Sequence, residues 1–449
     1  MPNTEKPQSS GAAAPIAPAG PETLSPAEKH KRYLFPCTAT YYETPLTIVR
    51  GEGMHVWDET GRKYLDCFGG VLTVNVGHCH PEVTAAIVKQ AQTLVHTSTL
   101  YVTPPLGDLA EAMAQALPAG LSRLFLTNSG SEADETAILL ARVHTGLHEI
   151  VVLRYGYSGR TMMAMASSGQ APWRKLPQPV PGFVHALAPY CYRCPLKLTY
   201  PSCEVACAND VKEVIETATT GRVAGIMVEV IMGSGGFLVP PKEYFPMVAD
   251  IVRKAGGIFI ADEVQTGFGR TGKLWGVDHY GITPDVMTFA KGMANGTPIG
   301  ATATTEPIAA SLKPLSFSTF GGNPVTSAAA LATLRVIQKQ NLAENARVMG
   351  ERLHQGFLGL QRKYKVIGDV RGIGLMRAME LVGEGKAPDA PTTARVLEGA
   401  RKRGVLVGKG GLWANVLRVA PPLIVNAAQI DELVAALDGA FAEATGASA

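Results

Sequence analysis

The chain has 449 residues, of which 46% are hydrophobic and 18% charged, a composition typical of globular proteins and too apolar for a disordered chain. Its 41 lysines and arginines exceed its 38 aspartates and glutamates by only three charges, so we expect no nucleic-acid partner. It has no run of 18 apolar residues and no secretory signal pattern, and its seven cysteines do not imply a disulfide scaffold, so we expect a cytoplasmic protein without a membrane partner.

The N-terminal part of the chain is predicted to hold a disordered tail followed by a small antiparallel meander. Residues 1–30 are assigned to the tail because the first 25 are rich in Pro, Ala, Gly and Ser. Short apolar runs at 48–50, 54–57 and 63–66 are separated by glycine-containing turns, and this spacing predicts the meander.

The middle of the chain alternates short apolar runs with helical patterns. The predicted strands are 124–126, 150–153, 225–230, 258–261 and 286–289. The predicted helices are 81–94, 106–116, 132–143 and 244–255. Strands that alternate with helices predict an α/β fold, in which helices cover both faces of a mainly parallel sheet.

The last quarter of the chain is predicted to form a separate α+β lobe. Helical patterns over 325–338 and 342–360 lead to strand-like segments at Val366, 375–381 and 417–420. We therefore expect four parts in chain order: a tail at 1–30, the N-terminal part of a small domain at 31–86, a large domain at 87–325, and the C-terminal part of the small domain at 326–449.

The strongest candidate functional residues follow two of the predicted strands. The run at 258–261 leads directly to Asp262, and the run at 286–289 leads to Lys291. Ligands of open α/β sheets bind at the carboxyl ends of the strands. A partly desolvated lysine is a good Schiff-base nucleophile, because desolvation lowers its pKa. The two residues are a candidate catalytic pair, with a structural ion pair as the alternative.

The same region contains a match to a dinucleotide fingerprint. Residues 267–272 read GFGRTG, and Asp285 lies near the position of a ribose-binding acid. The fingerprint requires a helix that opens at its third glycine. Residues 273–282 have no helical apolar stripe, which disfavours this interpretation. A dinucleotide-dependent oxidoreductase is kept as an alternative of another class.

A Gly-Ser turn precedes the helix predicted at 132–143. Ser129 and Glu132 have the spacing of a capping box. Gly130 and Ser131 would present backbone N–H groups at the positive end of the helix, where a phosphate binds well. Most capping boxes bind no ligand, and an ordinary cap is therefore the alternative.

Two further polar loops offer ligand contacts. Residues 154–161 carry the aromatic ring of Tyr157 and the cation of Arg160, and residues 318–324 form a glycine-rich turn with a hydroxyl at Thr319. Taken singly, each segment also fits a surface loop or a connector.

Four of the seven cysteines fall within 17 residues, at Cys191, Cys194, Cys203 and Cys207. This paired spacing is similar to that of tetrathiolate zinc and iron–sulfur sites. Packed reduced thiols and an optional disulfide are the alternatives.

Together, these segments resemble the class III pyridoxal-phosphate (PLP) aminotransferases. The matching segments occur in the family's order: Gly77-His78, 129–133, 156–161, Glu229, 262–272, Lys291-Gly292, 318–324, 369–376 and 417–423. The resemblance implies the type I fold of PLP enzymes, in which a large cofactor-binding domain with a seven-stranded, mainly parallel sheet accompanies a smaller α+β domain.

The resemblance also implies roles for individual residues. Lys291 would hold PLP as a Schiff base and act as the general base, and Asp262 would keep the pyridine nitrogen protonated. The other implied cofactor contacts are Ser129, Gly130, Ser131, Tyr157, Glu229, Val264, Gln265 and Thr319. Thr319 would reach the phosphate of a second subunit, which implies a homodimer; pairing of dimers into tetramers is left open.

For the substrates, the resemblance implies carboxylate binding by Arg160 and Arg418, with Glu229 masking Arg418 in one half-reaction. Ser158 stands where the family usually has histidine, and 229–233 departs from the usual sequence. These departures leave the donor open. The resemblance as a whole implies transfer of an amino group from an amino acid or ω-amino acid to a 2-oxo acid such as 2-oxoglutarate, pyruvate or glyoxylate. A PLP racemase on the same scaffold is the alternative.

Overall fold

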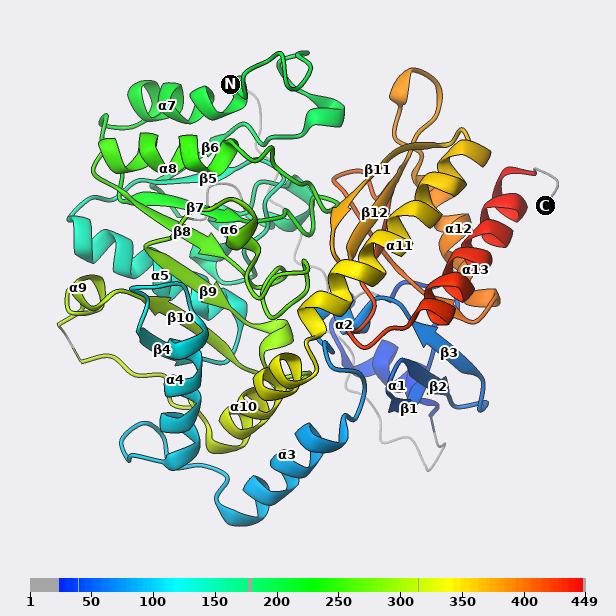
Figure 1. Ribbon diagram of the computed structural model, residues 1–449, viewed down its shortest axis with the longest axis horizontal. Coiled ribbons are helices and arrows are strands. Elements are labelled where there is room, and N and C mark those ends of the chain that lie inside the picture. Colours follow the sequence, from blue (N-terminus) through cyan, green and yellow to red (C-terminus); the bar gives the residue numbers. More distant parts are fainter. Residues whose placement is uncertain (1–23, 39, 177–179, 314, 447–449) are drawn as a thin grey trace, which may run out of the picture. The chain divides into compact units, whose positions relative to one another are not determined.

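The computed structural model describes residues 24–38, 40–176, 180–313 and 315–446 (Figure 1). The chain divides into two compact units, residues 1–48 and 49–449. The first unit holds helix α1 (Pro26–Tyr33). A reciprocal capping box between Ser25 and Glu28 stabilises the N-terminus of this helix. Most of the predicted tail lies outside the described residues, and the prediction is wrong for residues 26–30, which are helical.

The second unit is built on a seven-stranded sheet of order β4-β10-β9-β8-β7-β5-β6. Its strands are β4 (Arg123–Thr127), β5 (Ile150–Leu153), β6 (Phe183–Ala186), β7 (Gly225–Glu229), β8 (Ile258–Asp262), β9 (Val286–Phe289) and β10 (Gly300–Thr304). Only β10 runs antiparallel to its neighbours, and the remaining pairs among β5 to β9 are parallel. The predicted α/β fold with a mainly parallel seven-stranded sheet is confirmed.

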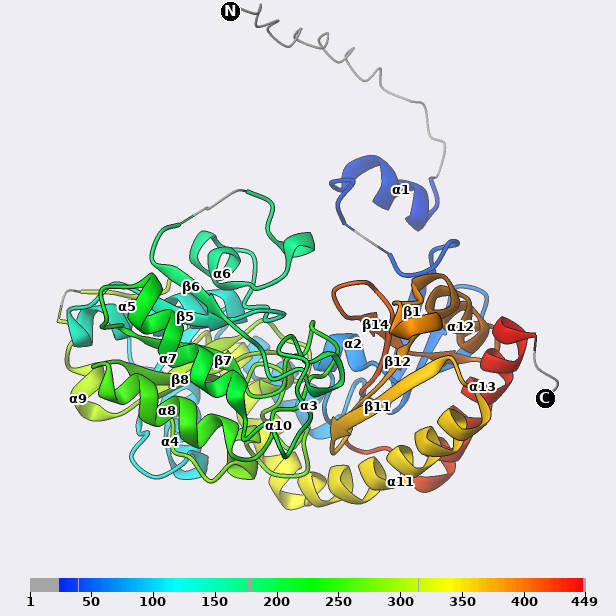
Figure 2. The same cartoon turned by 90° about the horizontal axis from the view of Figure 1, so that it is seen from above.

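Helices pack on the large sheet, as Figures 1 and 2 show. Helix α5 (Gly130–Thr145) packs against β9 and β10, α8 (Tyr244–Lys254) against β8, and α7 (Ala206–Ala218) against β6. The core under α5 includes Ile138, Val152, Met227 and Ile260. Burial of these aliphatic side chains is worth roughly 1.5–3 kcal/mol each, which fixes α5 over the middle of the sheet.

A second group of helices packs together beside the sheet. Helix α10 (Pro324–Lys339) contacts both α3 (Pro81–Thr93) and α4 (Pro104–Ala116), and each begins with proline at its first position. The short helices α6 (Met162–Ser167) and α9 (Glu306–Ala309) contact α5 instead. The helices predicted at 81–94, 106–116 and 325–338 are confirmed to within two residues at each end.

Two smaller sheets contain the other strands. One has the order β1-β2-β3-β13, with β1 (Ile48–Glu52), β2 (His55–Asp58), β3 (Lys63–Asp66) and β13 (Val405–Leu406). The other has the order β11-β12-β15-β14, with β11 (Ile367–Ile373), β12 (Met376–Leu381), β15 (Val416–Val419) and β14 (Gly408–Gly410). The parallel pair β3–β13 joins the early and late parts of the chain in one sheet.

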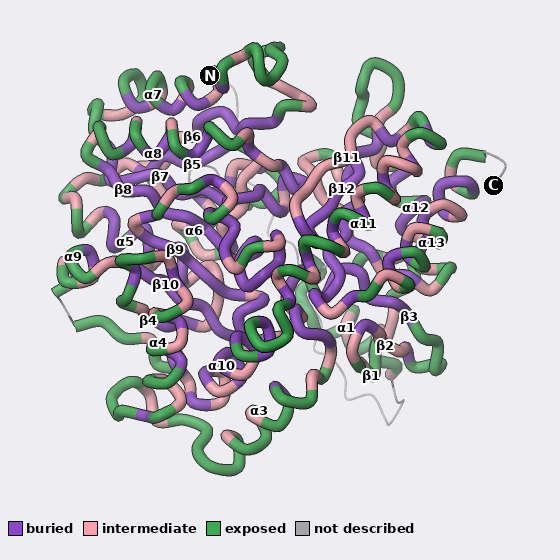
Figure 3. The backbone as a smooth tube through the Cα atoms, viewed as in Figure 1, coloured by how far each residue is buried: buried purple, intermediate pink, exposed green. Residues whose placement is uncertain are grey.

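The helices of this region are α2 (Gly69–Leu72), α11 (Leu342–Lys363), α12 (Ala390–Lys402) and α13 (Ala427–Thr445). Figure 3 shows buried backbone running through both the large sheet and the sheet of β11 and β12. The predicted α+β character of the C-terminal region is confirmed, and the predicted domain boundaries stay a prediction. Within the part of the chain that the structure describes, we find no helix with the length and apolarity needed to cross a bilayer.

Candidate active site

A cavity of about 170 Å³ lies where the N-terminus of α5 meets the carboxyl ends of β8 and β9. It is lined by Gly130, Ser131, Asp134, Tyr157, Ser158, Gly159, Arg160, Asp262, Val264, Gln265, Ala290 and Lys291. Eight of the sequence-predicted site residues are among them. Ser129, Glu229, Thr319 and Arg418 are predicted site residues that do not line this cavity.

The strand register explains why acidic and hydroxyl groups meet beneath the start of α5. Glu229, Asp262 and Thr288 are successive partners across the parallel strands β7, β8 and β9. Partners in a parallel pair direct their side chains to the same face of the sheet. The hydroxyl of Thr288 donates to Asp134 on α5, so this face is the one that α5 covers. The register thus forms one polar row beneath the start of α5.

Lys291 follows β9 with one residue between them, and its backbone is unusual. Its φ of +38° lies in the left-handed region, which costs a non-glycine residue about 1–3 kcal/mol. Burial lowers the pKa of Lys291 from its ordinary value, and the charges of Asp262 and Glu229 act in the opposite direction. The structure thus holds a desolvated amine at the carboxyl end of the sheet.

Asp262 ends β8 and is buried, with 5% of its surface exposed. Its Oδ1 accepts a hydrogen bond from the N–H of Val264 at 2.8 Å. Burial raises the pKa of Asp262 to about 6, while the Val264 N–H and the charge of Lys291 act to lower it. A cation bound opposite this carboxylate would favour its ionised form.

The N-terminus of α5 is open for an anion. The Oγ of its N-cap residue Ser129 accepts the N–H of Glu132 at 3.3 Å. Only this half of a capping box forms, because the Glu132 carboxylate accepts the N–H of Asn128 rather than that of Ser129. The N–H groups of Gly130 and Ser131 fall in the first turn, where a helix has no internal acceptors for them.

Gly159 brings the loop after β5 close to this helix end. Its φ is +136°, and a Cβ built there would lie 2.0 Å from the Ser131 Oγ. Only glycine fits, because both the backbone conformation and the space exclude a side chain. The next residue, Arg160, donates its N–H to the same Ser131 Oγ at 3.1 Å. This contact holds the loop against the anion site.

The cavity also has an aromatic wall and a buried amide. The ring of Tyr157 packs edge-to-face on Trp173, with 5.2 Å between centroids. The Oε1 of Gln265 is buried and accepts no hydrogen bond from a described residue. A buried acceptor without a donor favours a bound molecule that supplies one.

Glu229 and Arg418 are linked through the backbone of one residue, Gly233. The Glu229 carboxylate accepts the N–H of Gly233 at 2.8 Å and that of Tyr157 at 2.7 Å. Arg418 donates through Nη1 to the carbonyl of the same Gly233 at 3.2 Å. Burial, followed by the charge of Asp262, raises the pKa of Glu229 to about 8. A change at Arg418 can therefore reach Glu229 through the backbone of Gly233.

Arg418 itself lies on β15 and is mostly buried. Its guanidinium lies 5.0 Å from the ring centroid of Phe68 and 5.6 Å from that of Phe237, and its Nε donates to the carbonyl of Lys409. Aromatic faces and carbonyls leave a guanidinium charged and oriented. Thr319, in contrast, is exposed in the segment before α10.

The four clustered cysteines line one small cavity of about 20 Å³ between the loop after β6 and α7. All four are free thiols. Among the described residues, no three Cys, His, Asp or Glu side chains are placed to hold one metal ion. The tetrathiolate hypothesis therefore receives no support from the geometry.

Two further details bear on the sequence predictions. The segment after Gly272 leads into turns and a short 3₁₀ helix at Gly276–His279, so the helix of a dinucleotide fingerprint is absent from these described residues.

Sequence reasoning missed one residue of the cavity, Asp134. A signal existed, because Asp134, Ala137, Ile138 and Ala141 form the buried stripe of α5 at helical spacing, and an acid within such a stripe is rare.

The chain is similar to known aminotransferases. The family model described as Aminotransferase class-III matches residues 37–441. The chain is 42% identical over 422 residues to alanine–glyoxylate aminotransferase 2 homolog 2, mitochondrial, of Arabidopsis thaliana, which covers 93% of this chain and 87% of the relative. It is 40% identical over 413 residues to the acetylornithine aminotransferase of Thermosynechococcus vestitus, covering 90% and 94%. A PLP-bound amine transaminase from an uncultivated Pseudomonas species aligns with a TM-score of 0.86 at 32% identity, covering 92% and 99%.

Proposed function

The chain belongs to the class III aminotransferases, and on that premise we propose that it moves an amino group from an amino acid or ω-amino acid to a 2-oxo acid in two half-reactions. The observation that carries this proposal is the cavity in which Lys291, Asp262 and the N-terminus of α5 meet. An amine, a buried acid and an anion site within one enclosure are the groups that such a transfer requires.

We propose PLP as the cofactor, because the residues of the cavity fit each part of it. The first N–H groups of α5 suit its phosphate, the ring of Tyr157 suits its aromatic face, and the Asp262 carboxylate suits a protonated pyridine nitrogen. Gln265 has a buried, unused polar atom in the same cavity. When bound, PLP supplies an aldehyde that condenses with amines and a ring that withdraws electrons from the bond being broken.

Lys291 would hold the cofactor and carry the proton. Because burial lowers its pKa, a larger fraction of the amine is neutral near pH 7 than for an exposed lysine. Neutral Nζ can take a proton from the amine-bearing carbon of the donor and return it elsewhere on the bound molecules. Asp262 would keep a proton on the ring nitrogen, and its charge is effective because the carboxylate is buried.

For substrate binding, we propose that Arg160 and Arg418 hold carboxylates. Arg160 lines the cavity beside Ser131, and its position suits the distal carboxylate of an ω-amino acid donor. Arg418 would hold the carboxylate next to the oxo group, and its link to Glu229 through Gly233 would tune that contact. The relatives named for alanine–glyoxylate and acetylornithine agree with this range of substrates.

Replacing Arg418 by alanine should raise the KM for the 2-oxo acid about 10–100-fold, since a charge-assisted hydrogen bond is worth about 1.5–3 kcal/mol. Steady-state kinetics at varied oxo acid, together with the visible spectrum of the bound cofactor, would check this. Arg160→Ala is the matched variant and should raise the KM for an ω-amino donor instead. Loss of cofactor binding in Arg418→Ala, with an unchanged KM for the 2-oxo acid, would contradict the proposal that Arg418 binds the carboxylate of the oxo acid.

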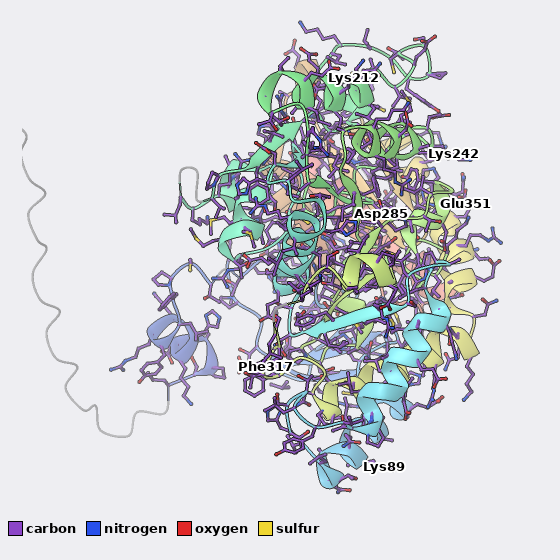
Figure 4. The ribbon with its side chains drawn as sticks, turned by 90° about the vertical axis from the view of Figure 1, so that its left-hand side faces the viewer. Lys89, Lys212, Lys242, Asp285, Phe317 and Glu351 are labelled. Atoms are coloured by element: carbon purple, nitrogen blue, oxygen red, sulfur yellow. The ribbon has the colours of Figure 1, made fainter. Side chains whose placement is uncertain are left out.

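We also propose that the enzyme is a homodimer, with Thr319 reaching the phosphate site of the second copy. Exposed apolar side chains gather on two segments: Leu94, Val95, Leu100, Tyr101, Val102, Leu315, Phe317 and Phe320. The segments are neighbours, because Asn323 donates to the Val95 carbonyl at 2.8 Å and the His96 ring lies 5.1 Å from that of Phe320. Figure 4 shows Phe317 at the surface. Apolar patches of this kind mark protein interfaces.

The proposed reaction is tested by supplying a panel of amino donors with 2-oxoglutarate, pyruvate or glyoxylate and measuring the new amino acid. We expect product only when both a donor and an oxo acid are present. Conversion of an amino acid into its mirror image without any oxo acid would support a racemase instead.

The cytoplasmic location of this chain stays a prediction. The Arabidopsis thaliana relative is named as mitochondrial.

A further inference from the structure

One buried acid of the cavity has no part in the reaction described above. Asp134 lies in the second turn of α5, lines the cavity with Asp262 and Lys291, and is 1% exposed. Its Oδ1 accepts a hydrogen bond from the hydroxyl of Thr288 at 2.7 Å. Thr288 is the register partner of Asp262, so Asp134 adds an acid to the polar row beneath α5.

The three acids of this group differ in what stabilises their charge. Glu229 accepts two backbone N–H groups and Asp262 accepts one. The hydrogen bond that the structure gives Asp134 comes from a hydroxyl, which can also accept a hydrogen bond from a neutral acid. Backbone N–H groups donate only, and they therefore favour an ionised carboxylate more strongly. Asp134 is the acid of the three that is best suited to be neutral.

The charges around Asp134 point the same way. The ionisable groups that face it are Asp262 from β8, Glu229 from β7, Lys291 after β9 and Tyr157 from the loop after β5. Three carboxyl groups face one buried amine, and neighbouring acids in a buried site cannot all be ionised at once, because their negative charges repel. Burial, followed by the charge of Asp262, raises the pKa of Asp134 well above its ordinary value.

We propose that Asp134 is a positioning residue that stays protonated in the working enzyme and so leaves Asp262 as the acid that carries the negative charge. This inference rests on the proposed function of the cavity. A second ionised acid next to Asp262 would make Asp262 harder to ionise, and the ring nitrogen would lose its counter-charge. A neutral Asp134 fills the same space and keeps the hydrogen bond to Thr288.

The proposal sets the sign of a pH effect on stability. In the unfolded chain an aspartate releases its proton near pH 4, whereas the folded chain keeps the proton on Asp134 to a higher pH. Between these two points the folded state binds one proton more, so the contribution of Asp134 to stability falls as the pH rises. The folding equilibrium constant loses up to tenfold per pH unit over this window.

The test is the thermal unfolding midpoint of the purified full-length chain and of Asp134→Asn, measured at steps from pH 5 to pH 8. The amide has nearly the shape of the neutral acid and cannot ionise. We expect the unfolding midpoint of Asp134→Asn to rise steadily relative to that of the unaltered chain as the pH rises. A difference between the two midpoints that is the same at every pH would overturn the proposal. Asp108→Asn, at an exposed acid on α4, is the control and should show no such trend.

A second variant keeps the test decisive if Asp134→Asn does not accumulate as folded protein. Thr288→Val removes the hydroxyl that donates to Asp134. With a neutral Asp134 the midpoint should fall by a similar amount at every pH. A fall that becomes much larger above pH 5 would show an ionised Asp134 left without its donor, and would overturn the proposal. Because these measurements do not use turnover, a failed transamination assay would reject the proposed function separately.

Discussion

Replacing Lys291 by alanine should abolish turnover, with a loss of at least about 10⁴-fold in kcat. Positioned general bases alone contribute about 10²–10⁴-fold, and this lysine is also proposed to hold the cofactor covalently. Its amine is desolvated, and its backbone is held in the left-handed region, so no neighbouring side chain can replace it. Single-turnover rates measured with added PLP separate loss of chemistry from loss of cofactor.

The matched control for this variant is Lys212→Ala. Lys212 lies on α7, is exposed and pairs with Glu216 across one helical turn, and Figure 4 shows it at the surface away from the sheet. An exposed pair of this kind contributes less than about 1 kcal/mol, so the control should retain full turnover. Comparable turnover in Lys291→Ala would contradict the assignment of the lysine.

Replacing Asp262 by asparagine should leave the cofactor able to bind but reduce kcat by about 10²–10³-fold, which corresponds to about 2.7–4 kcal/mol. An amide can accept a hydrogen bond from the ring nitrogen but supplies no negative charge to keep it protonated. The loss is large because the carboxylate is buried, and charges interact strongly in a dry site. Pre-steady-state rates of donor conversion would measure it.

Cofactor affinity should depend on pH through the Asp262 carboxylate. With the pKa of Asp262 raised to about 6, cofactor affinity should fall as the pH drops through that value, because the neutral acid must first lose a proton. Asp262→Asn should lose this dependence, whereas Asp262→Glu, which keeps the charge, should retain it and part of the rate. An unchanged kcat in Asp262→Asn would exclude the carboxylate from the chemistry.

Apolar runs identified most strands of the large sheet, and they failed for two. Strand β10 reads GATAT and contains no large apolar side chain, so its burial is not visible in the sequence. Strand β6 has four residues, one of them histidine. The antiparallel direction of β10 also follows from its pairing with β4 and β9, which no local pattern records.

For the site, the sequence located the residues that follow strand ends, and it could not supply contacts between distant segments. Tyr190 and Arg193, in the loop after β6, both bind Glu380 on β12, and Arg371 on β11 donates to the same carboxylate at 2.7 Å. Tyr190 and Arg193 lie 190 and 187 residues from Glu380 along the chain. Such a buried network depends on tertiary packing, and neither spacing nor composition indicates it.

The link between Glu229 and Arg418 is a similar case. The resemblance implies that Glu229 masks Arg418, and the structure shows a shared contact through the N–H and the carbonyl of Gly233. The sequence places Gly233 four residues after Glu229 but does not reveal that β15 brings Arg418 to its carbonyl. The proposed masking of Arg418 by Glu229 therefore has a physical route that residue types alone could not supply.

The most direct test of the central claim is the visible absorption spectrum of the purified chain supplied with PLP, recorded before and after amino donors are added without any oxo acid. We expect a visible band from the cofactor held by Lys291, its loss with at least one donor, and its return when a 2-oxo acid follows. Lys291→Ala should lack the lysine-dependent band. A chain that develops no such band with PLP would show that Lys291 does not hold the cofactor.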